Sequence, residues 1–177
     1  MLIIKRIYRH LLKRRFPVKY AKSIGVNFGE NLVIYGDVHW STEPWIIEIG
    51  NNVHITDGVR FLTHDGGTLL FRDIIPDLEI TKPIKIGDNV YIGNQVIILP
   101  GVSIGNNVII GAGAVVSKSI PDNSVAVGVP ARVIESADDY LKKAMNSSLH
   151  LGHLQGKKKD DALKKYYNYK GTSKGIY

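Results

Sequence analysis

Apolar residues recur every six positions along residues 84–110, with glycine and asparagine between them. One row of isoleucines has this period, and a second row of small apolar residues follows it four positions later. The first row is Ile86, Ile92, Ile98, Ile104 and Ile110, and the second is Val90, Val96, Val102, Val108 and Ala114. A helix of about 3.6 residues per turn cannot keep either row on one face, and an ordinary strand alternates at every second residue. The pattern therefore predicts short flat strands joined by tight corners, six residues to a side and three sides to a turn.

The corners carry the residue types that such a chain path needs. Residues 86–90 (IGDNV) and 104–108 (IGNNV) are near copies eighteen positions apart, and residues 28–34 and 49–55 repeat the same pattern less regularly. Glycine and asparagine tolerate the positive φ of a tight corner. Because one turn cannot bury its apolar face alone, successive turns must stack around a shared core. The sequence thus predicts an all-β solenoid.

Both ends of the chain predict helices. Residues 1–16 mix apolar and basic side chains at helical spacing and contain no apolar run of the ~18 residues that span a bilayer. This segment is either an interfacial helix on an anionic membrane or a helix packed against the solenoid or another subunit, and we favour packing. Near the other end, Ser136 precedes a predicted helix, and residues 160–167 predict a second one.

The chain is expected to have three parts. Residues 1–23 form the basic N-terminal helix, residues 24–134 the solenoid, and residues 135–177 a helical tail. Within the solenoid, the period breaks after Phe61 and resumes near Ile84. An excursion of this length, at residues 62–83, is not needed by the scaffold and is therefore expected to serve function.

Composition limits the chemistry. The 177 residues include no cysteine, which excludes disulfides, thiolate metal sites and a cysteine nucleophile. The net charge of +7 is concentrated at the two ends, since residues 26–134 hold six basic and eleven acidic residues. No recognition motif for nucleic acid accompanies the basic charge, so nucleic-acid binding is not expected.

Two segments near the end of the solenoid resemble C-terminal coil motifs of a known family. They are residues 111–116 (GAGAVV) and 127–134 (VGVPARVI). Together with the six-residue period, they make residues 24–134 similar to the hexapeptide-repeat acyltransferases, closest to sugar O-acetyltransferases of the galactoside and maltose type. The resemblance implies a left-handed parallel β-helix with short terminal helices, acetyl-CoA as donor, and a homotrimer in which each active site needs two chains.

His64 stands where the chain leaves the coils, at the position of the family's catalytic histidine. It is followed by Asp65-Gly66-Gly67 instead of the proline typical of the galactoside and maltose enzymes, as in O-acetyltransferases of surface-polysaccharide clusters. Acyl transfer to a hydroxyl needs a base for the hydroxyl proton, and histidine suits this near neutral pH. Asp65 is expected to orient the imidazole, with a backbone carbonyl as the alternative.

The resemblance also implies a groove for acetyl-CoA. Small residues permit close approach of the pantetheine arm, and a backbone N–H near the thioester would stabilise the oxyanion. Basic residues would meet the phosphates and the adenine end. The expected donor-site residues are Asn94, Gly111, Ala112, Gly113, Ser117, Lys118 and Arg132.

The segment around residues 38–45 contains both tryptophans of the chain and is the candidate acceptor site. We assign His39, Trp40 and Glu43 to saccharide binding, with Trp40 as a stacking face, although such a tryptophan often fills a core or an interface. His39, His54 and His64 are too early in the chain to match the zinc ligands of the related γ-class carbonic anhydrases, so no metal site is expected.

Taken together, these features predict a cytoplasmic O-acetyltransferase that acts on a saccharide hydroxyl by direct transfer, in surface-polysaccharide biosynthesis. The alternatives are amino-sugar N-acetylation, antibiotic acetylation, and a non-catalytic scaffold attached to the inner membrane face through the N-terminal helix.

Overall fold

The computed structural model describes residues 11–171. The chain divides into two compact units, Met1–Tyr140 and Leu141–Tyr177. The division into three parts with boundaries after residues 23 and 134 remains a prediction.

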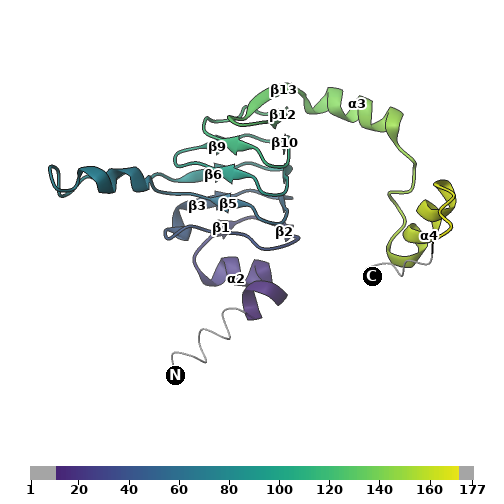
Figure 1. Cartoon of the computed structure of the whole chain (residues 1–177), viewed down its shortest axis with the longest axis horizontal. Coiled ribbons are helices and arrows are strands. Elements are labelled where there is room, and N and C mark those ends of the chain that lie inside the picture. Colours follow the sequence, from purple (N-terminus) through teal and green to yellow (C-terminus); the bar gives the residue numbers. More distant parts are fainter. Residues whose placement is uncertain (1–10, 172–177) are drawn as a thin grey trace. The chain divides into compact units, whose positions relative to one another are not determined.

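Strands of two to five residues form three sheets in the first unit, and in each sheet the strands lie one above the next (Figure 1). We name them sheets A, B and C. Sheet A contains β1 (Asn27–Phe28), β3 (Ile47–Ile49), β6 (Ile84–Ile86) and β9 (Ser103–Ile104). Sheet B contains β2 (Val33–Ile34), β4 (His54–Ile55), β7 (Val90–Ile92), β10 (Val108–Ile110), β12 (Ser124–Val127) and β13 (Arg132–Ser136). Sheet C contains β5 (Arg60–Phe61), β8 (Ile97–Ile98) and β11 (Val115–Val116).

The chain visits the sheets in the order A, B, C, and one such circuit is a coil. Strands of successive coils pair in parallel, and β13 returns antiparallel to β12. The regular coils repeat at the predicted eighteen residues, as in the pairing of Tyr91 with Ile109. The first coil is longer, since Val33 pairs with His54, 21 positions on. From His54 to Tyr91 the step is 37 residues, so the excursion adds 19 residues to a regular coil.

The core confirms the six-residue pattern. All ten residues of the two predicted rows are buried, with at most 5% of their surface exposed. Beside them, Phe61 packs its ring against Trp40, with the ring centroids 5.0 Å apart. Removing this apolar surface from water is the main driving force for stacking the coils.

Asparagine occupies the corners in the left-handed conformation, as the sequence predicted. Five asparagines one coil apart have φ between 53° and 56°: Asn31, Asn52, Asn89, Asn107 and Asn123. The amide of Asn52 donates to Asn89 at 2.8 Å, and that of Asn89 donates to Asn107 at 3.2 Å. These side chains therefore join neighbouring coils while their backbones turn the corner.

Helices occur at both ends. Residues 11–15 are helical and α2 (Pro17–Ser23) follows them, whereas the first ten residues of the predicted N-terminal helix lie outside the described part. A short 3₁₀ helix, η1 (Pro44–Ile46), lies in the first coil. The predicted C-terminal helices are present as α3 (Ala137–Ser147) and α4 (Gly156–Tyr166). Within residues 11–171, no helix combines the length and apolar character that crossing a membrane requires.

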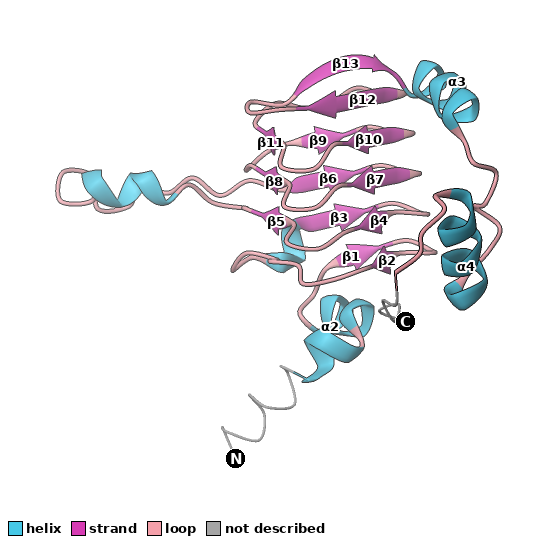
Figure 2. Ribbon diagram, turned by 45° about the vertical axis from the view of Figure 1, so that its right-hand side comes forward, coloured by secondary structure: helices cyan, strands magenta, loops and turns pink. Residues whose placement is uncertain are grey.

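Residues 62–83, which we call the arm, leave the stack after β5 and return to β6 (Figure 2). An antiparallel bridge between His64 and Thr81 closes the base of the arm, and η2 (Gly66–Phe71) begins just beyond it. Six large apolar side chains of the arm are at least 38% exposed: Leu69, Leu70, Phe71, Ile74, Ile75 and Ile80. Most of the arm's apolar surface is thus not covered by other residues of the described part, 11–171.

Candidate active site

The candidate site forms at the corner where the chain passes from sheet C to sheet A. In the first coil this corner holds residues 40–46, and in the second coil it is the base of the arm. A parallel β-bridge pairs His39 with Arg60, which lies 21 residues further along the chain, the same spacing as in the rest of this coil. A step of 21 brings Glu43 next to His64, and the Glu43 Oε2 atom lies 2.9 Å from the His64 Nδ1 atom.

Three hydrogen-bond donors converge on the Glu43 carboxylate. The Thr42 hydroxyl donates to Oε1 at 2.5 Å, and the Thr63 hydroxyl, whose side chain is buried, lies 2.6 Å from Oε2. His64 Nδ1 is the third. Ser41 supports this arrangement, since its Oγ lies 2.7 Å from the Thr63 Oγ1. The carboxylate is therefore held in position by residues from two successive coils.

This environment keeps Glu43 ionised. Partial burial opposes the charge, but the hydrogen bonds from Thr42, Thr63 and His64, with the positive charge of a protonated His64, outweigh it and lower the pKa of Glu43 from 4.5 to about 2. The carboxylate side chain is 25% exposed, so solvent screens these interactions only in part. Glu43 is consequently a fixed negative charge next to the imidazole at neutral pH.

The charge on Glu43 determines which ring nitrogen of His64 is free. An ionised carboxylate can only accept hydrogen bonds, so the Nδ1 atom must carry a proton to bond with it. In the neutral imidazole the lone pair is then on the Nε2 atom. With its side chain 40% exposed, His64 is accessible to a ligand. The pair therefore has the arrangement of a general base oriented by a carboxylate.

Asp65 does not make the orienting contact that we predicted for it. Its Oδ1 accepts a hydrogen bond from the Gly67 N–H at 2.9 Å, and this bond begins η2. Asp65 has an extended backbone, in which successive side chains point to opposite faces. Glu43, which we assigned to the acceptor, is instead the carboxylate at Nδ1.

A pocket of about 250 Å³ surrounds this pair. Besides Glu43 and His64, its lining comprises Thr42, Asp65, Gly66, Thr68, Leu69, Arg72 and Glu79. Across the described part of the chain, no group of three or more His, Cys, Asp or Glu residues could hold a metal ion.

The two tryptophans of the candidate acceptor segment differ in exposure. Trp40 is 4% exposed and lies parallel to Phe61, with 4° between the ring planes, so Phe61 covers a face that we predicted for a sugar. Trp45 is 63% exposed. His39 lies beside them, and its Nδ1 atom accepts from the Ser41 N–H at 3.3 Å. Of this segment, Trp45 has the ring that a sugar can reach.

The predicted donor residues fall at two corners. Asn94 and residues 111–113 lie between sheets B and C, where the Gly113 N–H donates to the Asn94 carbonyl at 2.8 Å. Arg132 begins β13, which starts near this corner. Ser117 and Lys118 follow β11, and therefore lie on the same corner as His64, two coils further along.

The backbone at Gly113 is open to a ligand. A Cβ atom built there would meet no atom within 4 Å, whereas one at Gly111 would come within 2.7 Å of the Val127 side chain. Gly113 also has φ +71°, which glycine adopts at little cost. Gly111 is thus needed for packing between coils, and Gly113 is the position where a ligand can lie against the main chain.

Sequence reasoning missed Thr42 and Thr63 as members of the site. A signal for them was present in the spacing of the coils. Residues 28–34 and 49–55, which carry the same corner pattern, are 21 positions apart rather than eighteen. Extending that step places residue 43 beside 64, and residue 42 beside 63.

Comparisons with known proteins agree with this architecture. A family model described as bacterial transferase hexapeptide (six repeats) matches residues 83–118. Protein CapG of Staphylococcus aureus is 41% identical over 147 residues, which are 82% of this chain and 86% of that protein. The chain spans only 57–61% of the length of three other curated relatives.

Two solved structures are similar over most of the chain. A maltose O-acetyltransferase from Clostridium difficile 630 is 34% identical with a TM-score of 0.55, over 74% of this chain and 81% of that one. A galactoside acetyltransferase in complex with coenzyme A is 29% identical with a TM-score of 0.55, over 79% of this chain and 82% of that one.

Proposed function

Because this chain belongs to the hexapeptide-repeat acyltransferase family, we propose that it transfers an acetyl group from acetyl-CoA to a hydroxyl group of a saccharide. The observation that carries the proposal is the Glu43–His64 pair, which leaves one imidazole nitrogen free as a base at an accessible corner. The solved relatives named as maltose and galactoside acetyltransferases support a saccharide acceptor.

In the proposed reaction, His64 Nε2 takes the proton of the acceptor hydroxyl while its oxygen attacks the thioester carbonyl. The new C–O bond forms, the C–S bond breaks, and the proton passes from the imidazolium to the departing CoA thiolate. Glu43 stabilises the transient imidazolium because its negative charge lies 2.9 Å from Nδ1. Since no covalent enzyme intermediate is needed, the rate depends mainly on holding both substrates in line.

We propose that acetyl-CoA lies along Asn94 and Gly111–Gly113, with Ser117, Lys118 and Arg132 toward its phosphates. The open backbone at Gly113 and the relative crystallised with coenzyme A support this groove. An acetyl-CoA donor would also make the reaction cytoplasmic.

The donor site yields a prediction for Lys118. Replacing it by alanine should raise the KM for acetyl-CoA about fivefold to tenfold with kcat unchanged, because one charge-assisted contact to a phosphate is lost. Steady-state kinetics at varied acetyl-CoA concentration measure this effect. Lys85→Ala is the matched control, since Lys85 pairs with Glu48 on sheet A and should leave the KM unaltered. A fall in kcat at constant KM would contradict the assignment.

We propose a homotrimer, for which the outer faces of the sheets provide support. Outward side chains of sheet A are polar: Asn27, Glu48, Lys85 and Ser103. Sheet B instead carries Val33, His54, Tyr91 and Ile109 outward, and sheet C carries Arg60, Ile97 and Val115. A three-fold ring would bury sheets B and C and leave sheet A in water.

The exposed apolar arm supports the same assembly and gives it a test. Leu70 is 82% exposed, and in the trimer we expect it to contact a partner. Leu70→Asp should therefore convert a trimer of about 59 kDa, three times 19.6 kDa, into monomers in light scattering after size exclusion. Ser103→Asp, which adds the same charge to sheet A, should remain trimeric. A wild-type monomer would reject the assembly.

Two finer features belong to the proposal. The coils are expected to wind left-handed, as the family resemblance implies, against the usual right-handed crossover, and a crystal structure with right-handed coils would contradict this. The sequence His64-Asp65-Gly66-Gly67 favours an acceptor from surface-polysaccharide biosynthesis.

The test of the proposed function is release of the CoA thiol from acetyl-CoA in the presence of sugars, nucleotide sugars and oligosaccharide fragments. We expect release that depends on a saccharide and an ester product that alkali removes. An alkali-stable amide product would indicate N-acetylation instead. If calorimetry detects no binding of CoA, the enzyme proposal is wrong and the scaffold alternative remains.

A further inference from the structure

A second, larger pocket opens beside the His64 pocket. Thr42 lines both pockets, and its Oγ1 lies 3.2 Å from the His64 Nδ1. The second pocket has a volume of about 480 Å³, against 250 Å³ around His64. Small-ligand sites typically measure about 300–1,000 Å³. The His64 pocket alone is therefore small for a ligand, and the second pocket shares one wall residue with it, Thr42.

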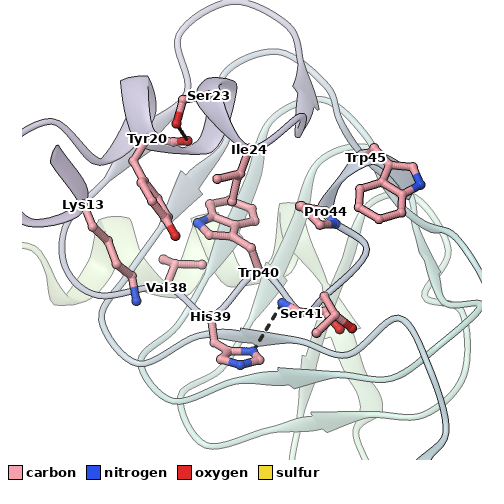
Figure 3. A pocket seen from close by; sticks show the side chains of 11 residues that line it. Lys13, Tyr20, Ser23, Ile24, Val38, His39, Trp40, Ser41, Pro44 and Trp45 are labelled. Carbon is pink, nitrogen blue, oxygen red and sulfur yellow. Dashed lines mark hydrogen bonds between the residues drawn. The ribbon is translucent and has the colours of Figure 1, made fainter. Parts of the chain in front are cut away.

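The walls of this pocket come from two parts of the chain. Lys13 and Tyr20 belong to the helical segment that precedes the coils, and His39, Ser41 and the two tryptophans belong to the first coil (Figure 3). The helical segment thus serves as one side of a binding space.

The indole of Trp40 presents an unused hydrogen-bond donor to this pocket. The residue is 96% buried, yet among the described residues none accepts a hydrogen bond from its Nε1–H. Each fully buried side-chain nitrogen or oxygen of the described part does have a partner. Because the Nε1 atom has no partner and is not among these fully buried atoms, it must reach solvent. Trp40 lines this pocket, and Figure 3 shows its nitrogen on the edge of the ring that faces Tyr20. Buried tryptophan N–H groups usually find an acceptor, so a ligand atom is a natural partner.

Two further polar groups on the wall are free. The Tyr20 hydroxyl has no hydrogen-bond partner among the described residues. In His39, the Nδ1 atom accepts from the Ser41 N–H, so the neutral ring carries its proton on Nε2, which has no partner within residues 11–171. Together with Trp40, these residues place three donors on the wall of the pocket.

The charges on the wall favour an electron-rich ligand. None of the described residues that line this pocket is acidic, and Lys13 supplies one ammonium group. That group pairs at 2.6 Å with Asp37, which lies outside the lining and has a side chain 71% exposed. Such a wall matches a ligand that presents acceptor oxygens.

We propose that this pocket binds a second saccharide unit of the acceptor, adjacent to the unit that receives the acetyl group. This inference rests on the proposed function. The second unit presents a carboxylate or an acetamido carbonyl to Trp40 Nε1, the Tyr20 hydroxyl and His39 Nε2. Exposed Trp45 supplies an apolar surface for the sugar ring. The acceptor is accordingly an oligosaccharide or longer chain that contains an acidic or N-acetylated sugar.

The test measures binding without acetyl-CoA, by the fluorescence of the two tryptophans. The probes are N,N′-diacetylchitobiose, a disaccharide of glucuronic acid and N-acetylglucosamine, and maltose, which lacks both acceptor groups. At least one of the first two should bind about tenfold or more tighter than maltose. Tyr20→Phe removes one hydroxyl and Trp40→Phe removes the indole N–H while keeping a ring against Phe61. Each substitution should weaken the binding of that preferred disaccharide by about three- to tenfold and leave the binding of maltose unchanged.

Tyr35→Phe is the matched control, since Tyr35 is exposed and lies outside the lining of this pocket. The proposal is overturned if maltose binds as tightly as the other probes, if no probe binds, or if both variants bind the disaccharides as the wild type does. A wild-type protein that binds the preferred disaccharide through these residues but transfers no acetyl group would reject the proposed function and leave this pocket assignment standing.

Discussion

Replacing His64 by alanine is expected to lower kcat for saccharide acetylation by about 10²- to 10⁴-fold, which is the usual contribution of a positioned general base. The imidazole is held at Nδ1 by Glu43 and Thr42, so its Nε2 is the nitrogen available to the hydroxyl proton. The side chain is partly exposed, and its removal should leave the buried core intact. Release of the CoA thiol with a fixed acceptor measures the effect.

The control is His153→Ala. His153 is exposed and lies between α3 and α4, and it lines neither pocket, so its loss should leave kcat near the wild-type value. If His64→Ala retains wild-type kcat, the base is another group. A raised KM for the acceptor at constant kcat would reduce His64 to a binding residue.

Replacing Glu43 by glutamine is expected to lower kcat by about 10²-fold. The amide has the same shape, but three donors converge on the two carboxylate oxygens, from Thr42, Thr63 and His64. Whichever oxygen becomes an NH₂ group therefore faces a donor. The imidazole loses both its fixed tautomer and the charge that stabilises its protonated form. Glu48→Gln, on the polar face of sheet A, is the matched control and should retain activity.

The same substitution should change the acid stability of the protein. The pKa of Glu43 is about 2 in the fold against 4.5 ordinarily, so the folded state favours the ionised carboxylate. Its contribution to the free energy of unfolding is complete above about pH 5 and is lost as the pH falls toward 2. Because the Glu43 side chain is 25% exposed, solvent screening keeps its contribution below the roughly 3 kcal/mol that a full pKa shift from 4.5 to about 2 represents. Urea unfolding at pH 7 and pH 3, at one protein concentration, measures this effect. Between the two pH values the free energy of unfolding should fall less for Glu43→Gln than for the wild type. An equal fall in both proteins would contradict the role of this carboxylate.

The two results separate catalysis from scaffolding. A scaffold would tolerate both substitutions without loss of function, whereas an enzyme that uses the Glu43–His64 pair would lose activity in both while its core remains folded. Because the two residues act as one unit, their combined loss should be far smaller than the product of the single losses.

The coils could be predicted because their signal is local and repeated. Ile92, Val96, Ile110 and Ala114 are all buried. Each regular coil has three sides of six residues, and each of these four residues occupies a position that points inward. Any one coil is a weak indication, but the repetition over residues 84–116 excludes helices and plain hairpins.

The site could be predicted only in part. His64 stood out because the chain leaves the repeat there, at the position of the catalytic histidine in the family that the repeat resembles, and Gly113 was one of the small residues of a motif of that family. The partner of His64 did not, because the sequence alone suggested its neighbour Asp65. An extended backbone turns that neighbour away, and the stacking of coils brings in Glu43 from 21 positions earlier.

By itself, then, the sequence determined the stacked coils, the asparagine corners and the place where the arm leaves the stack, since these depend on the period of apolar residues and on which residues tolerate positive φ. Only the tertiary structure decided that Glu43 meets His64, that Trp40 packs on Phe61 while Trp45 is exposed, and that Tyr20 and Trp40 line one pocket. Those contacts join residues of different coils and helices, and they depend on the length of each coil and on how side chains fill the space between them.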